Sequence, residues 1–354
     1  MTLGNDYLGS STGPMAEGVG AERALRQGEV VGNQYEVRGL LGEGAQGLVY
    51  EAFDQLLARP VALKLAKTAE GDSGLWQESR AMAAVRSASV PQIHGLVSHR
   101  GAPVLVMERV FGTPLDRLLS YRRGQAMPVG EALELLIGLG SALVEVHRSG
   151  IAHRDVKPAN VIIAGCGRTV LMDFGIVLPE VEATAALASG TPFYLAPEQL
   201  QGTLQVGEAH LVDIYSLGVV AFELLTGRVP FDGEVDAILH GHLRQPVPHL
   251  SMFRRDLPAA LVQLIHEMMA KDPLERAGSM EQVVGRLQAI RGSLGRNTPR
   301  EPLAPVRPST APARVQTPVV VPAARPAVAT KPAPRPQTAP ASSAQTWLSR
   351  RSGS

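Results

Sequence analysis

The feature that most constrains the fold is a change of hydrophobic periodicity about one third of the way along the chain. Strand patterns come first, at residues 35–41, 48–53 and 60–66. A helix is predicted over 75–86 and a short apolar strand over 104–108. Beyond Gly130 the helical period dominates, with helices predicted at 131–149, 210–226, 257–271 and 280–291. The order predicts an α+β protein with two lobes of different class and a cleft between them.

Two segments of different composition flank this periodic region. Residues 1–33 are rich in small residues, with a short helical pattern at Ala21–Gln27, and are predicted to be a flexible leader. Residues 293–354 hold 12 of the 27 prolines. Such a segment buries too little surface to offset its ordering entropy, so a disordered Pro/Ala/Arg-rich tail is predicted. The folded domain is then 34–292.

The net charge of +1 hides an asymmetry between the domain and the tail. The tail carries nine basic residues and one acid, which is +8, so the rest of the chain carries −7. A negative main domain argues against nucleic-acid binding there, although the basic tail leaves DNA binding open as a third hypothesis.

The sequence also disfavours a membrane-spanning protein, a secreted protein and a disulfide-stabilised protein. No apolar run approaches the ~18 residues of a membrane span, and the N-terminus lacks the pattern of a secretory signal. Cys166 is the only cysteine, which excludes an intramolecular disulfide and a cysteine-rich zinc site. A cytoplasmic protein without a membrane span is expected.

A glycine-rich turn, Gly42–Gly47, joins the first two predicted strands. Glycines let a backbone approach a phosphate and point amide groups at it, but a hairpin turn that needs positive φ explains them about equally well. A dinucleotide-binding fingerprint would join a strand to a helix, so that class is disfavoured.

Lys64 lies near the end of the third predicted strand, within an apolar run. A buried lysine needs an anionic partner or ligand, and Glu78 on the following helix is the best candidate. The alternative is a solvated lysine on an edge strand.

The most specific motif is His153–Asn160, which reads HRDVKPAN, followed by Asp173, Phe174 and Gly175. It combines a carboxylate able to accept a hydroxyl proton, a cation, an amide oxygen and a second carboxylate. Hard oxygen ligands of this kind suit Mg²⁺ held between a protein and substrate phosphates.

With these motifs, and with Ala196-Pro197-Glu198 after them, the chain resembles a eukaryotic-like (Hanks-type) bacterial serine/threonine protein kinase over about residues 35–292. Lys157, two residues after Asp155, is the serine/threonine signature. The resemblance implies the two-lobed protein-kinase fold: an N-lobe (about 34–107) with a small antiparallel sheet and one helix, a hinge (108–112) and a helical C-lobe (113–292).

The resemblance also implies site residues and cofactors, namely ATP and Mg²⁺, with Mn²⁺ as a substitute. Asp155 would be the catalytic base and Lys157 would neutralise the γ-phosphate, while Asn160 and Asp173 would hold the metal. The positions matching the family's ATP site are Leu41, Gly42, Glu43, Gly44, Ala45, Gln46, Gly47, Val49, Ala62, Lys64, Glu78, Met107, Glu108 and Val110.

The resemblance also implies residues with structural and regulatory roles. Glu198 is expected to form a buried ion pair with Arg276, and Asp213 to brace the catalytic loop. Arg154 would await a phosphate on the activation segment, unless water or Glu180 satisfies it in a constitutively active enzyme. The candidate phosphorylation sites are Thr184, which is preferred, Ser189 and Thr191.

The function implied is transfer of the ATP γ-phosphate to serine and threonine hydroxyls of protein substrates, with autophosphorylation. The alternative is a pseudokinase scaffold that binds partners through its kinase-like domain and tail. Scaffolds commonly lose a catalytic residue, and none is lost here. The tail is interpreted as a passive tether, or else as an arm that docks on a partner.

Overall fold

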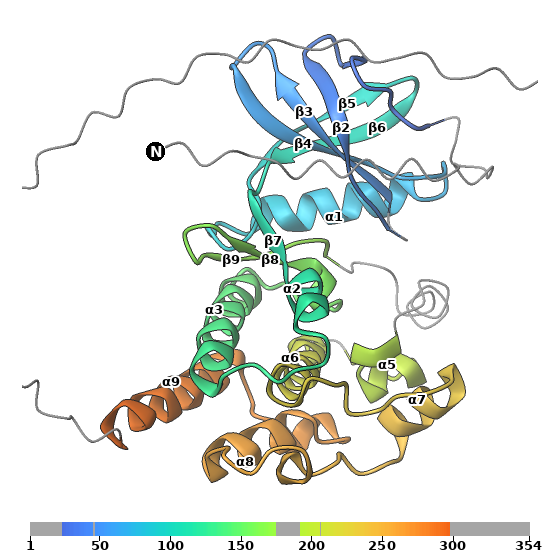
Figure 1. The fold of residues 1–354 in the computed structure, drawn as a ribbon. Helices are drawn as coiled ribbons and strands as arrows, with labels where there is room; N and C mark the ends of the chain where they lie inside the picture. The colour runs from blue at the N-terminus through green and yellow to red at the C-terminus, as the bar shows by residue number, and fades with distance from the viewer. Residues whose placement is uncertain (1–22, 45–46, 175–191, 206, 298–354) are drawn as a thin grey trace, which may run out of the picture. The chain divides into compact units, whose positions relative to one another are not determined.

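The computed structural model describes residues 23–44, 47–174, 192–205 and 207–297. The N-lobe is an antiparallel sheet with the strand order β1-β2-β3-β4-β6-β5, and α1 (Asp72–Ala84) packs against β5 and β6 (Figure 1). The strands are β1 (Val30–Val31), β2 (Tyr35–Gly44), β3 (Gly47–Asp54), β4 (Arg59–Leu65), β5 (Ile93–His99) and β6 (Ala102–Glu108).

The alternation of side chains along β4 explains why this strand is buried on both faces. Val61, Leu63 and Leu65 join one apolar cluster with residues of β2, β3 and β6. Ala62 joins the larger cluster that extends into the C-lobe, and Lys64 shares its face because strand side chains repeat every two residues. The face that holds Ala62 and Lys64 therefore lines the site.

The C-lobe is built from helices around α6, with a small sheet ordered β7-β8-β9 next to the N-lobe (Figure 1). The helices are α2 (Leu115–Arg122), α3 (Val129–Arg148), α5 (Pro197–Gln201), α6 (Ala209–Thr226), α7 (Val235–Leu243), α8 (Ala259–Met268) and α9 (Met280–Asn297). The strands are β7 (Gly112–Pro114), β8 (Val161–Ala164) and β9 (Thr169–Leu171), and 3₁₀ turns lie at Pro158–Asn160, Pro192–Tyr194, Leu250–Met252 and Pro273–Glu275.

Helix α6 is long and apolar enough to cross a membrane by length and composition alone, which the sequence analysis did not foresee. Its 18 residues have a mean hydropathy of 1.4, and 83% of them are buried inside the protein. A helix that is apolar all round is also what a protein core requires. We therefore assign α6 as the core helix of the C-lobe.

The α+β fold with two lobes that the sequence predicts is confirmed, with corrections at both ends of the domain. The short helical pattern at Ala21–Gln27 does not form a helix in its described part, because residues 23–28 form turns and irregular chain. Residues 23–33 belong to the N-lobe and not to a leader, since β1 pairs with β2 and Leu25 is buried. At the other end α9 continues to Asn297, five residues into the predicted tail.

The β8–β9 hairpin joins the C-lobe to the N-lobe. The Arg168 guanidinium donates to the Ala88 carbonyl (2.6 Å) and to the Glu108 carboxylate (2.7 Å), and the Leu171 N–H donates to the Ser89 carbonyl (2.8 Å). Cys166 is exposed in the turn of this hairpin.

Candidate active site

The glycine-rich turn is a hairpin between β2 and β3, in which Gly44 pairs with Gly47. Gly47 has φ +151°, and a Cβ there would lie 2.3 Å from the Leu65 carbonyl oxygen, so no other residue fits. A Cβ on Gly42 or Gly44 would meet nothing within 4 Å. Gly47 is thus required by the packing of β3 on β4, while the other two glycines border open space.

Lys64 is buried, at 1% exposure, and its Nζ contacts two carboxylates. It donates to Glu78 Oε1 (2.6 Å) and Oε2 (2.7 Å), and to Asp173 Oδ1 (2.9 Å). Burial by itself would lower the pKa of Lys64, but the charges of Asp173 and Glu78 hold it above its ordinary value. The predicted partner is present, and the solvated edge-strand alternative is wrong.

The segment before β1 contacts the N-terminal end of α1, the helix that carries Glu78. The Arg23 guanidinium donates to both carboxylate oxygens of Asp72 (2.7 and 3.1 Å) and to the Thr68 carbonyl (3.1 Å). The residue preceding the helix, Gly71, makes no side-chain cap. Sequence reasoning missed Arg23, because this contact spans 49 residues and leaves no local pattern.

In the catalytic loop, Asp155 is held from two directions. Asn160 Nδ2 donates to its carboxylate Oδ2 (2.8 Å) and to its backbone carbonyl (2.9 Å). Lys157 Nζ lies 2.8 Å from the same Oδ2. Within the described ranges, no residue hydrogen-bonds to the other carboxylate oxygen, Asp155 Oδ1.

Asp213, on α6, fixes the backbone just before Asp155. Its carboxylate accepts the N–H groups of His153 (2.8 Å) and Arg154 (2.7 Å), and Oδ2 lies 2.7 Å from His147 Nε2. Arg154 has φ +65°, a strained left-handed conformation, and Gln199 Nε2 donates to its carbonyl (2.9 Å). The predicted bracing by Asp213 is present, while His147 and Gln199 were not foreseen.

Asp213 keeps its negative charge although its side chain is completely buried. Burial raises the pKa of this carboxyl, but the hydrogen bond and charge of His147, together with the backbone N–H groups, hold the pKa below its usual range. Asp213 is therefore a carboxylate at neutral pH and can accept both backbone N–H groups of the loop.

In the part of the chain that the structure describes, two oxygen atoms of the expected metal ligands have no hydrogen-bond partner. Asn160 donates through Nδ2, so its side-chain oxygen is unused, and Asp173 gives only Oδ1 to Lys64. Among the described residues no cluster of three or more His, Cys, Asp or Glu side chains could hold a metal by itself. Two hard oxygens completed by substrate phosphates fit Mg²⁺, which usually keeps few protein ligands.

The hinge begins where β6 ends. Met107 is buried and pairs with Ala62 of β4. The Glu108 N–H donates to the Gln92 carbonyl (2.8 Å), and Arg109 Nη1 donates to the Val110 carbonyl (2.5 Å). The backbone at this edge of the site is therefore already engaged at two positions.

The remaining predicted ATP-site residues lie on β2 and β3. Val49 packs against the large apolar cluster, and Leu41 is partly exposed. Glu43 Oε1 pairs with Lys67 Nζ at 2.7 Å. Five predicted site residues lie outside the described residues: Ala45, Gln46, Thr184, Ser189 and Thr191.

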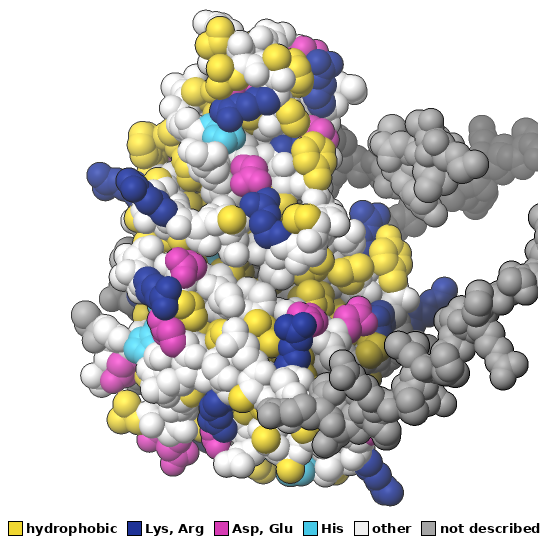
Figure 2. Space-filling model, turned by 90° about the vertical axis from the view of Figure 1, so that its left-hand side faces the viewer, with side chains coloured by type: hydrophobic (Ala, Val, Ile, Leu, Met, Phe, Trp, Pro, Cys, Tyr) yellow, Lys and Arg dark blue, Asp and Glu magenta, His cyan; other side chains and the backbone are white. Residues whose placement is uncertain are grey.

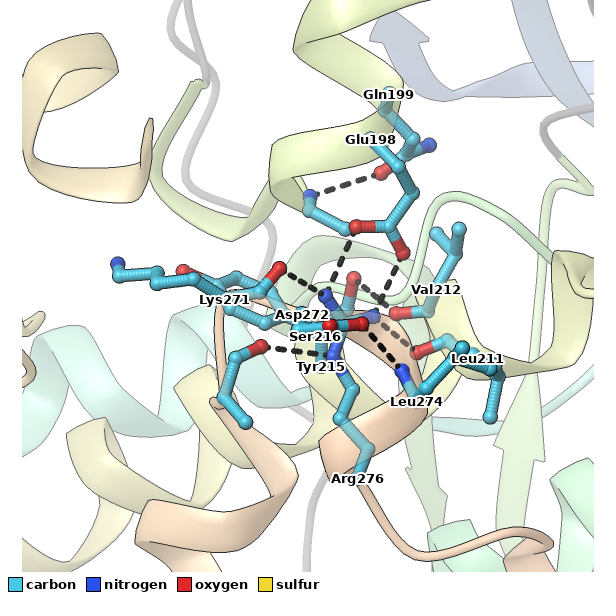
Figure 3. A network of polar contacts seen from close by, with 12 residues as sticks. Glu198, Gln199, Leu211, Val212, Tyr215, Ser216, Lys271, Asp272, Leu274 and Arg276 are labelled. Atoms are coloured by element: carbon cyan, nitrogen blue, oxygen red, sulfur yellow. Dashed lines mark hydrogen bonds and ion pairs between the residues drawn. The ribbon is translucent and has the colours of Figure 1, made fainter. Parts of the chain in front are cut away.

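The ion pair predicted between Glu198 and Arg276 is present, buried and bidentate (Figure 3). Arg276 Nη1 and Nη2 donate to Glu198 Oε1 (2.6 Å) and Oε2 (2.8 Å). The remaining donors reach the carbonyls of Ala270 and Leu211, both at 2.9 Å. This network fixes α5, directly after the activation segment, to the loop before α9.

Known proteins resemble this chain in both sequence and fold. The protein kinase domain family matches residues 35–286. Serine/threonine-protein kinase PksC of Streptomyces coelicolor is 33% identical over 269 residues, covering 71% of this chain and 48% of that protein. PknA of Mycobacterium tuberculosis is 32% identical over 305 residues, covering 82% and 68%.

A solved structure agrees. The kinase domain of Mycobacterium tuberculosis PknI, in the form of a double mutant, superposes with a TM-score of 0.61 at 28% identity, covering 76% of this chain and 100% of that domain. The chain spans about half the length of PksC. With the motifs in place and the family matching most of its length, the chain belongs to the protein kinase family, among the bacterial serine/threonine protein kinases of eukaryotic-like type.

Proposed function

We propose that this protein transfers the γ-phosphoryl group of ATP to serine and threonine hydroxyls of proteins. The observation that carries the proposal is the double ion pair of Lys64 with Glu78 and Asp173. It joins α1 to the loop after β9, and so brings the three charged groups into one site. A pseudokinase scaffold has no need of this arrangement.

We assign the nucleotide to the space between the β2–β3 hairpin and the hinge. Gly42 and Gly44 leave room for the phosphates, and Lys64 supplies a positive charge there. Val49, Ala62 and Met107 provide the apolar walls for the base, and the backbone from Glu108 to Val110 its polar edge. We assign the rest of the flap over the phosphates to Leu41, Glu43, Ala45, Gln46 and Gly47.

We assign Asp155 as the base, because its free Oδ1 can accept the proton of the acceptor hydroxyl. Lys157 neutralises charge on the transferred group. Asn160 and Asp173 hold Mg²⁺, or Mn²⁺ in its place, which supplies charge stabilisation when bound. Since phosphoryl transfer has a loose transition state, these residues act by alignment and electrostatics and form no covalent intermediate.

We propose separately that phosphorylation of the activation segment regulates the activity. Arg154 adjoins the base, and its guanidinium is a donor suited to a phosphate on the activation segment. We favour Thr184 over Ser189 and Thr191 as the autophosphorylation site. Phosphopeptides found only outside residues 176–191 would count against this.

We also propose a cellular compartment, a class of partner and a role for the tail. Use of ATP and the single cysteine favour the cytoplasm. Basic and acidic side chains alternate over the face shown in Figure 2, which supports protein substrates over nucleic acid as partners of the domain. We propose that residues 293–354 act mainly as a tether, with docking on a partner as the alternative.

The test is to incubate the purified full chain with Mg²⁺ and labelled ATP, beside Asp155→Asn. Asp236→Asn, an exposed carboxylate on α7, is the matched control. We expect phosphate on threonine or serine in the wild type and the control, and at least about a hundredfold less in Asp155→Asn. ATP binding without transfer in the wild type, at every metal and substrate tried, would favour a scaffold.

A further inference from the structure

Helix α1 carries an exposed tryptophan on the face that is turned away from the core. Its buried face, which includes Leu75 and Met82, packs into the large apolar cluster. The opposite face holds Trp76, Arg80 and Ala83, which lie in one row because helix neighbours recur every three to four residues. Trp76 is 51% exposed. Tryptophan and arginine are the side chains that anchor protein interfaces, so this row, the Trp76 stripe, is a candidate docking surface.

The charge that remains on α1 is positive. Its two carboxylates, Asp72 and Glu78, are already paired with basic side chains. Arg80 and Arg86, which follows the helix, are both exposed, and the ion pairs of the described residues include neither of them. An aromatic ring beside two cations is complementary to a partner that is both apolar and acidic.

The chain before β1 begins beside this surface. Residues 1–22 lie outside the described residues, and the residue that follows them, Arg23, is bound to Asp72 at the first turn of α1. Along the helix axis, Trp76 lies about 6 Å from Asp72 and Arg80 about 12 Å. Four extended residues span about 13 Å, so the residues directly before Arg23 are long enough to reach both side chains.

The composition of residues 1–22 is complementary to the stripe. The segment contains three acidic residues and no lysine or arginine. Met15 and Val19 stand two residues before and two residues after Glu17. In an extended chain, residues two apart point to the same side, so these three side chains would present two apolar groups and one carboxylate to a single surface.

We propose that residues 15–19 dock on the Trp76 stripe of the same chain, with Met15 and Val19 on the indole ring and Glu17 paired with Arg80. The tether at Arg23 makes this binding intramolecular, so contacts that would be weak between separate molecules are sufficient.

Docking has a consequence for catalysis because α1 carries Glu78, which contacts Lys64. A second point of attachment on α1 favours the arrangement in which these two side chains meet. Its loss is therefore expected to lower kcat more than KM for ATP. The docking does not depend on the proposed kinase function, whereas this effect on transfer rests on it.

The first measurement is the quenching of Trp76 fluorescence by acrylamide in the full chain. Trp347→Phe removes the other of the two tryptophans. This protein is compared with the same protein carrying Glu17→Arg, or Met15→Ser together with Val19→Ser. We expect the quenching constant of the docked indole to be about twofold or more below that of either variant, because docking excludes water from the ring.

Charge exchange tests the partner assigned to Glu17. Arg80→Glu should increase the quenching as Glu17→Arg does, and the protein with both changes should recover the protection, because the pair is rebuilt in reverse. Rescue of this kind excludes misfolding as the cause. Asp6→Arg, in the same segment, and Arg244→Glu, an exposed arginine after α7, are the matched controls and should leave the quenching unchanged.

Initial rates of phosphoryl transfer on the same proteins measure the catalytic consequence. We expect kcat to fall several-fold in Glu17→Arg and in Arg80→Glu, and to return when the two changes are combined. Both matched controls should keep the kcat of the parent protein.

The outcomes separate docking from the kinase function. Equal quenching in the parent protein, Glu17→Arg and the double serine variant overturns the docking and leaves the kinase function standing. Protection that appears only as the chain concentration rises shows that a second copy covers Trp76, which also overturns docking within one chain. Absence of transfer in every protein overturns the kinase function, while the quenching still decides the docking.

Discussion

Lys64 is a cation enclosed by two carboxylates from different lobes, so its removal has two separable effects. Lys64→Met should lower phosphoryl transfer by about a hundredfold or more, because a charge directed at the phosphates is lost. It should also lower the free energy of unfolding by about 3–5 kcal/mol, because the Glu78 carboxylate stays buried without its cation.

Urea unfolding and initial-rate assays measure the two effects. Lys64→Met combined with Glu78→Leu should recover part of the stability and none of the activity. Recovery of activity in the double variant would contradict the role given to Lys64.

His242 predicts a pH dependence of stability. It is buried, its Nδ1 lies 2.9 Å from the Tyr215 hydroxyl, and the Phe231 ring and Lys271 lie close by. Burial, and then the charge of Lys271, lower the pKa of His242 to about 3 from an ordinary value of 6.5. Above pH 6.5 the residue is neutral in both states, and below it only the unfolded chain takes up the proton.

The free energy of unfolding should therefore fall as the pH drops below 6.5, by up to ~1.4 kcal/mol per pH unit from this residue. Urea titrations at pH 7.5, 6.5 and 5.5 measure the slope. His242→Gln, which cannot titrate, should show a shallower fall. Parallel slopes for the two proteins would disprove the assignment.

The sequence predicted some site residues better than others, for a physical reason. A lysine in an apolar strand needs a counterion, so the Lys64–Glu78 pair could be inferred from local burial. His147 and Asp213 lie 66 residues apart, and a histidine on a helix has many ordinary surroundings. Only the fold brings these two side chains together.

At the scale of elements, α1 is held at its N-terminal end by the chain before β1. Arg23→Ala should lower kcat for transfer several-fold, because α1 then holds Glu78 less firmly against Lys64, while KM for ATP changes less. Arg26→Ala, an exposed arginine three residues later, is the control. Initial rates at varied ATP measure both parameters.

Exchanging the charges of Arg23 and Asp72 tests whether Arg23 acts through this ion pair. Arg23→Asp combined with Asp72→Arg should recover more activity than either single change gives, since the pair is restored in reverse. Equal loss in the exchanged and single variants would show that Arg23 acts through packing and not through Asp72.

Element boundaries could be predicted where one face is consistently apolar. Helices α3, α6, α8 and α9 agree with their predicted ranges within a few residues, apart from the extension of α9. Strand β5 was missed because its residues are nearly all half-buried and its sequence, IHGLVSH, does not alternate. The segment 23–33 was misassigned because its small and polar residues are fixed by contacts to distant strands.

At the scale of the whole molecule, the order of motifs was enough to predict two lobes, since a strand-rich part and a helix-rich part cannot share one layer. It could not predict how the lobes are joined. The contacts of Arg168 with Ala88 and Glu108 depend on where a two-stranded hairpin ends, which no periodicity encodes.

That hairpin has a practical consequence. Its turn holds Cys166, which is exposed and is the only thiol in 354 residues. A maleimide fluorophore or a nitroxide spin label would therefore attach at a single known position without prior removal of other cysteines. The label would lie two residues from the guanidinium that links the lobes, where its emission or its line width would report in real time whether nucleotide binding loosens or tightens that link.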